Sequence, residues 1–98
     1  MIVVRDIFYL KFGKAKEAKE LLKEGQKINK EFGYENTRAL TDLTGKSYTL
    51  VLESEWKDLA AWESSMKEGL GADKWQKWYQ KLIPLVDSAS REIYSIVA

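Results

Sequence analysis

Seven side chains of this sequence are of types that can do chemistry in a pocket. They are arginines, glutamates and aromatic residues, which can pair charges, donate hydrogen bonds and hold a flat ligand: Arg5, Tyr9, Arg38, Glu53, Trp56, Glu92 and Tyr94. A carboxylate in an enclosed pocket can act as an acid or a base, because burial raises its pKa. The same charges could instead form a structural ion-pair network or a water-exposed rim. We therefore treat the seven as candidate ligand-pocket residues and assign no catalytic residue.

The residue types that are missing exclude whole classes of site. The chain has no His and no Cys, which removes the commonest general base, the usual haem ligand, thiolate zinc sites and cysteine nucleophiles. We therefore predict no metal and no cofactor.

The charge balance and the apolar runs bear on partners and location. The 16 Lys and Arg against 15 Asp and Glu give a net charge of +1, so we expect neither a nucleic-acid partner nor a membrane surface. No apolar run approaches the ~20 residues that cross a bilayer, and no secretory signal is visible. We expect a cytoplasmic protein.

The elements that must position these residues follow from the apolar pattern. β-branched and aromatic residues predict strands over residues 2–12, 36–43, 47–55 and 89–97. Apolar residues three and four apart predict a helix over 14–32 and helical segments over 56–83. The break at Gly69–Ala72 is either a lid over a pocket or a joint between two helices. This order predicts one domain, residues 1–98, with a ferredoxin-like α+β fold, in which helices cover one face of a four-stranded antiparallel sheet.

The first predicted strand is apolar on both faces, so we expect both faces to be covered. Val4, Phe8 and Leu10 would face the helices, and Ile7 would face the other side. Nothing else in so short a chain could cover that side, so we predict a homodimer whose two sheets face each other around a barrel-like interior. All seven candidates except Trp56 would face this interior. A register shift of one residue would exchange the two faces.

The four tryptophans are unusual in so short a chain. Trp62, Trp75 and Trp78 lie on helical apolar stripes, which is typical of core residues. Trp56 lies at a predicted strand-to-helix corner, which favours a role in the wall of a pocket for a flat apolar ligand.

Two other functions of this fold class do not fit the residues. An RNA-recognition module needs aromatic stacking residues on its third strand, whereas residues 46–53 (KSYTLVLE) keep one Tyr and lack the glycine of that motif. A copper-chaperone domain needs paired cysteines.

Three stretches resemble the dimeric α+β barrel superfamily. Residues 9–14 (YLKFGK) are similar to its strand–Gly–Lys–helix opening, and residues 53–63 (ESEWKDLAAWE) to the strand-to-helix passage of NIPSNAP-like and antibiotic-biosynthesis-monooxygenase-like members. Residues 78–86 and 90–94 are similar to the last helix and strand of small uncharacterised members. The resemblance implies a ferredoxin-like homodimer, while activities within the superfamily differ. Its haem-degrading members use a histidine ligand, which this chain lacks.

Two functional hypotheses remain. The first is a protein that binds an apolar or aromatic small molecule in the dimer interior, with a cofactor-independent monooxygenase-like reaction as its enzymatic form. The second is a non-catalytic structural or dimerisation module whose interior is filled by its own side chains. A cavity of a few hundred Å³ with converging polar groups would favour the first hypothesis.

Overall fold

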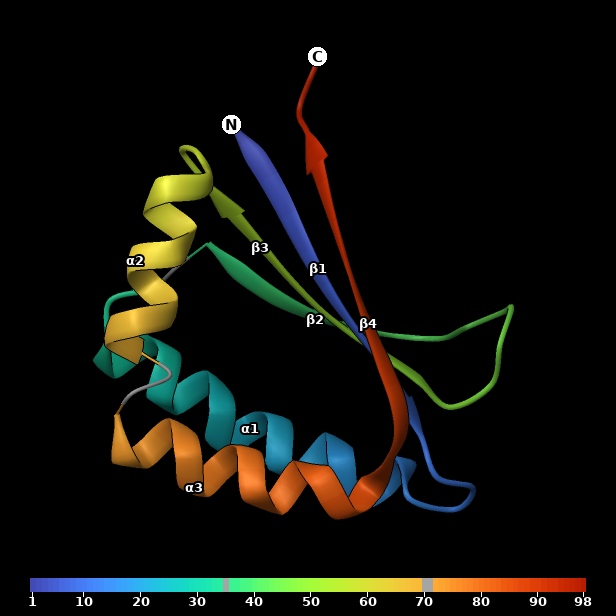
Figure 1. Cartoon of the computed structure of the whole chain (residues 1–98). Helices are drawn as coiled ribbons and strands as arrows, with labels where there is room; N and C mark the ends of the chain where they lie inside the picture. The colour runs from blue at the N-terminus through green and yellow to red at the C-terminus, as the bar shows by residue number, and fades with distance from the viewer. Residues whose placement is uncertain (35, 70–71) are drawn as a thin grey trace.

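A computed structural model describes residues 1–34, 36–69 and 72–98. Along the chain its elements are β1 (Ile2–Leu10), α1 (Ala15–Glu31), β2 (Thr37–Thr41), β3 (Thr49–Trp56), α2 (Leu59–Gly69), α3 (Asp73–Leu82), a short 3-10 turn (Ile83–Leu85) and β4 (Val86–Ser95). The four strands form one antiparallel sheet in the order β2-β3-β1-β4. The helices lie on one side of this sheet, with α1 and α3 side by side (Figure 1). This arrangement confirms the predicted ferredoxin-like α+β fold.

Element ends differ from the prediction where a turn or a cap decides them. Strand β1 stops at Leu10 instead of residue 12, because Gly13 takes a φ of 83° and Phe12 turns into solvent. Strand β4 begins at Val86, before the predicted residue 89, because Val86 already pairs with Leu10. Helix α2 begins at Leu59, where the Asp58 carboxylate accepts a hydrogen bond from the Ala61 amide.

The predicted break at Gly69–Ala72 includes residues 70 and 71, which lie outside the described residues. Helix α2 ends at Gly69 and α3 begins at Asp73. In the described part of the chain, no helix is both long enough and apolar enough to cross a membrane.

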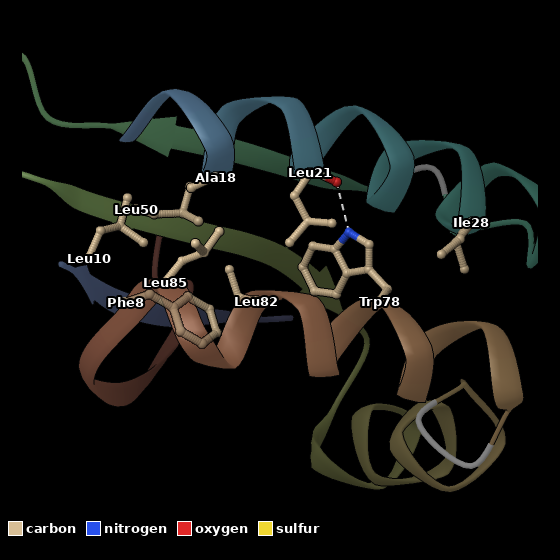
Figure 2. Packing of buried hydrophobic residues seen from close by; sticks show 9 residues of the cluster. All are labelled: Phe8, Leu10, Ala18, Leu21, Ile28, Leu50, Trp78, Leu82 and Leu85. Carbon is tan, nitrogen blue, oxygen red and sulfur yellow. Dashed lines mark hydrogen bonds between the residues drawn. The ribbon is translucent and has the colours of Figure 1, made fainter. Parts of the chain in front are cut away.

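The core lies where α1 and α3 pack on the sheet. Figure 2 shows its members: Phe8, Leu10, Ala18, Leu21, Ile28, Leu50, Trp78, Leu82 and Leu85. Trp78 is 3% exposed, and its indole Nε1 donates a 2.8 Å hydrogen bond to the Leu21 carbonyl of α1. Gly25 gives this indole its space, because a Cβ at that position would lie 2.9 Å from Cε2 of Trp78. The absence of a side chain in α1 therefore lets the two helices approach closely.

The strand register divides side chains between two faces. Phe8 and Leu10 of β1 pack under the helices, and Asp6 shares this face because side chains alternate along a strand. Arg5 lies on the opposite face, directly across from Glu53 of β3 and Glu92 of β4. The register matches the predicted assignment of the two faces.

Candidate functional site

A large hollow in the described structure lies between the helices and the sheet. It is a cavity of ≈ 640 Å³ whose walls come mainly from α1, α2, α3 and the helix-facing side of the sheet, with Arg38 and Glu53 of the opposite face also bordering it. All four tryptophans line it: Trp56, Trp62, Trp75 and Trp78. The cavity is therefore on the side of the sheet opposite to the face where the sequence placed a ligand.

Aromatic contacts fix the orientation of several lining residues. The Trp75 and Trp78 rings meet edge to face, with centroids 5.3 Å apart. Tyr34, which follows α1, meets Trp56 edge to face at 5.7 Å. Trp56 also donates an indole hydrogen bond of 2.8 Å to the Ser54 hydroxyl. Such contacts hold rings in place and give the cavity stiff walls for a flat ligand.

The Tyr34 hydroxyl brings a hydrogen-bond donor to one end of the cavity. Burial raises the pKa of Tyr34, and the Glu68 carboxylate raises it further. Tyr34 and Trp75 both pack closely against Gly69, the last residue of α2. A Cβ built on Gly69 would lie 3.3 Å from Oη of Tyr34 and 3.6 Å from Nε1 of Trp75. A phenol that stays protonated and an indole N–H thus meet where α2 ends.

An ion pair that we did not predict from the sequence lies on the sheet side of the cavity. Asp6 of β1 and Arg91 of β4 both line the cavity, and Oδ1 of Asp6 accepts a 2.5 Å hydrogen bond from Nε of Arg91. The Arg91 guanidinium lies 5.0 Å from the Trp62 ring centroid, within the range of a cation–π contact. The sequence contains a signal for this position of Asp6. Side chains alternate along a strand, so Asp6 shares the helix-facing side that is predicted for Val4 and Phe8.

Three of the seven predicted residues meet on the opposite face of the sheet. Glu53 accepts a 2.8 Å hydrogen bond from Nε of Arg38, and its other oxygen lies 3.4 Å from Nε of Arg5. The Glu53 side chain is 12% exposed. Two arginines thus compensate one largely buried carboxylate, which is the arrangement that such a carboxylate requires.

The other predicted residues are spread around this cluster. Tyr94 is half-exposed, and a hydrogen bond with the Glu92 carboxylate is the main reason that its pKa is raised. The Tyr9 ring lies under the Lys46 ammonium, with Nζ 3.8 Å from the ring centroid. Of the seven, Arg38, Glu53 and Trp56 are among the residues that line the cavity, whereas Arg5, Tyr9, Glu92 and Tyr94 are not. The seven therefore do not converge on this one cavity.

The described residues contain no group of three or more acidic, histidine or cysteine side chains placed to hold a metal ion. The chemistry available among the lining residues comes from two carboxylates, two guanidinium groups, two phenols, amides, hydroxyls and indole N–H groups.

Comparison with known proteins adds a fold-level relationship. No protein-family model matches the chain, and no curated protein matches it either. Solved structures do match. A NIPSNAP domain protein from Burkholderia xenovorans superposes with a TM-score of 0.88 at 18% identity, covering 100% of this chain and 96% of the other. A NIPSNAP family protein from Agrobacterium tumefaciens gives 0.87 at 20% identity, over 96% and 90% of the two chains.

A second group of structures is more distant. A candidate antibiotic biosynthesis monooxygenase from Nitrosomonas europaea superposes with a TM-score of 0.75 at 13% identity over 100% of both chains. Likeness at this level of identity concerns the fold. The resemblance found in the sequence is thereby confirmed, and the chain has the ferredoxin-like α+β fold of NIPSNAP domain proteins and candidate antibiotic biosynthesis monooxygenases.

Proposed function

We propose that this protein binds an apolar or aromatic small molecule in the cavity between its helices and its sheet. One observation carries the proposal: a cavity of ≈ 640 Å³ into which all four tryptophans of the chain are gathered. That volume falls within the roughly 300–1,000 Å³ of typical small-molecule sites, which are mainly apolar with a few placed polar groups. A purely structural module would be expected to fill such a space with its own side chains.

Filling the cavity tests the proposal. Ala39 of β2 lines the cavity, whereas Ala60 is exposed on α2. We expect Ala39→Trp to weaken the binding of naphthalene-like ligands by at least about tenfold, because the new indole takes the ligand's place. Ala60→Trp adds the same group outside the cavity and should leave binding unchanged. Isothermal titration calorimetry measures the affinity of each variant.

Thermal shift provides the second readout. A ligand at about 100 times its Kd stabilises a folded protein by about 2.7 kcal/mol, which is readily seen in a domain of this size. A panel of apolar aromatic molecules that leaves both the calorimetric signal and the melting temperature unchanged would contradict the proposal and favour the structural module.

A monooxygenase-like reaction is the second candidate function. It is favoured by the likeness to candidate antibiotic biosynthesis monooxygenases, together with the Asp6 carboxylate and Tyr34 phenol in the cavity. Oxygen uptake with aromatic quinols, recorded on the same mixtures, separates catalysis from binding alone. Ala39→Trp should abolish any uptake that takes place in the cavity.

We also propose that a second copy of the chain covers the helix-free face of the sheet. The helices lie on the other side (Figure 1), and this face carries the half-buried Leu40 beside the Arg5–Glu53–Arg38 cluster, while Ile7 and Val51 of the same face are only 9% exposed in the single chain. Tyr94, at the β4 edge of the same face, is 50% exposed. Both charge signs are present, so the face can be complementary to itself under two-fold symmetry.

A further inference from the structure

The Asp6–Arg91 pair places two opposite charges on the helix-facing side of the sheet, where the cavity lining is mainly apolar. The two residues are cross-strand neighbours, one on β1 and one on β4, and both line the cavity. The Asp6 side chain is 29% exposed and the Arg91 side chain 42% exposed, so each is partly shielded from solvent. Leu52 and Phe8, the neighbours of Asp6 on the same face, leave a ligand few other polar contacts there.

The pair keeps unused hydrogen-bonding groups. Among the described residues, Oδ1 of Asp6 and Nε of Arg91 form the one hydrogen bond found for either side chain. Oδ2 of Asp6 remains an acceptor, and the terminal Nη groups of Arg91 remain donors. The Trp62 ring beside the guanidinium restrains its plane. An acceptor and donors therefore stand next to each other in a restrained arrangement.

The charges that line the cavity cancel. Asp6 and Arg91 carry one charge of each sign and pair with each other on the helix-facing side of the sheet. Glu53 and Arg38 also border the cavity, but their side chains pair with each other on the opposite face. A ligand carboxylate that approached Arg91 would also approach Asp6, and the two like charges would repel each other. A cationic ligand that approached Asp6 would likewise be repelled by Arg91. An uncharged ligand is repelled by neither residue.

We propose that the Asp6–Arg91 pair makes the cavity selective for uncharged planar molecules that carry an N–H and a C=O side by side, as a lactam does. The ligand N–H donates to Oδ2 of Asp6, and the ligand carbonyl accepts from an Nη group of Arg91. Asp6 also acts as a charge filter, because without its carboxylate the guanidinium would hold a carboxylate in a two-pronged contact. This inference rests on the proposed function, since it assigns the ligand class of the same cavity.

Three fused-ring probes of similar size test the inference on the wild-type protein. Carbostyril has the lactam edge, its N-methyl derivative lacks the N–H, and naphthoate carries a full negative charge. We expect carbostyril to bind at least about tenfold more tightly than either of the others, since each loses a hydrogen bond or meets a like charge. Calorimetric titration gives the three affinities. Equal affinities would overturn the inference and leave the proposed function standing, whereas no binding by any aromatic probe would overturn both.

Asp6→Asn tests the charge filter directly. Asn keeps the shape of Asp and removes its charge, so naphthoate should now bind more tightly than carbostyril. Arg91→Gln should weaken both probes, because the donors are lost. Glu24→Gln is the matched control: it removes one negative charge from the exposed Glu24–Lys81 pair outside the cavity and should preserve the wild-type order. Circular dichroism verifies that each variant is folded. A folded Asp6→Asn protein that still prefers carbostyril would overturn the inference.

Discussion

At the scale of single residues, the lack of a side chain at Gly25 decides how closely α1 and α3 pack. Gly25 in α1 faces the indole of Trp78 in α3, and the indole is anchored by its hydrogen bond to the Leu21 carbonyl (Figure 2). The indole therefore has little freedom to move away from an added methyl group. The contact matters for the cavity as well, because Gly25 and Trp78 both line it.

We expect Gly25→Ala to destabilise the protein in spite of the better helix propensity of Ala. Propensity favours Ala by about 1 kcal/mol, whereas overpacking against a fixed ring costs about 1–3 kcal/mol. Urea denaturation of the wild type and the variant gives the net change. The matched measurement is the same substitution in a Trp78→Phe background, where the smaller ring leaves room and the methyl group should become neutral or stabilising. Equal effects in both backgrounds would contradict the packing explanation.

At the scale of elements, Tyr34 links the end of α1 to the end of α2 and to Trp56 of β3. Its pKa is raised above 10.0, first by burial and then by Glu68, so the folded protein prefers the neutral phenol. The stability that this preference contributes is present below pH 10.0 and is lost as the pH rises through the higher folded-state pKa.

We therefore expect the wild type to lose stability relative to Tyr34→Phe as the pH rises above 10.0. Denaturant unfolding at a series of pH values, analysed as the difference between the two proteins, cancels the other groups that titrate in this range. Glu68→Gln should shrink the pH-dependent difference without removing it, because burial is the larger cause. Parallel stability curves for wild type and Tyr34→Phe would contradict the assignment.

The elements themselves could be predicted because their patterns are local. β-branched and aromatic residues over 2–12 and apolar spacing over 14–32 predicted the strand and the helix, which the structure has at Ile2–Leu10 and Ala15–Glu31. Assigning Val4, Phe8 and Leu10 to the helix-facing side then gave the face on which Arg5 lies. The cavity could not be predicted, because it depends on how far α2 and α3 stand from the sheet. Trp62 and Trp75 show the limit: a helical apolar stripe predicts that they turn inward, but not that they meet a hollow instead of a packed core. Asp6 could not be recognised from the apolar pattern, because it is a charged residue on a strand face that is otherwise apolar.

At the scale of the whole molecule, the proposed dimer explains why a half-exposed Tyr94 stands on a helix-free sheet face. We expect the wild type to sediment as a dimer at micromolar concentration and Tyr94→Glu to dissociate more readily, by at least about tenfold in Kd, because a buried unpaired charge is costly. Leu43→Glu is the control, since Leu43 is 97% exposed in the connection between β2 and β3. A wild-type protein that sediments as a monomer at micromolar concentration would contradict the dimer.

The sheet is a single layer, and this has a consequence for which changes of length the chain can tolerate. Leu52 and Glu53 are consecutive in β3, yet Leu52 faces the cavity and the Glu53 carboxylate lies between two arginines on the other face. An insertion or deletion of one residue in β3 would exchange their sides, placing a carboxylate beneath the helices and a leucine among the arginines. The connection formed by residues 42–48 has no such constraint on its alternation. We therefore expect insertions and deletions to be tolerated in residues 42–48 but not in β3.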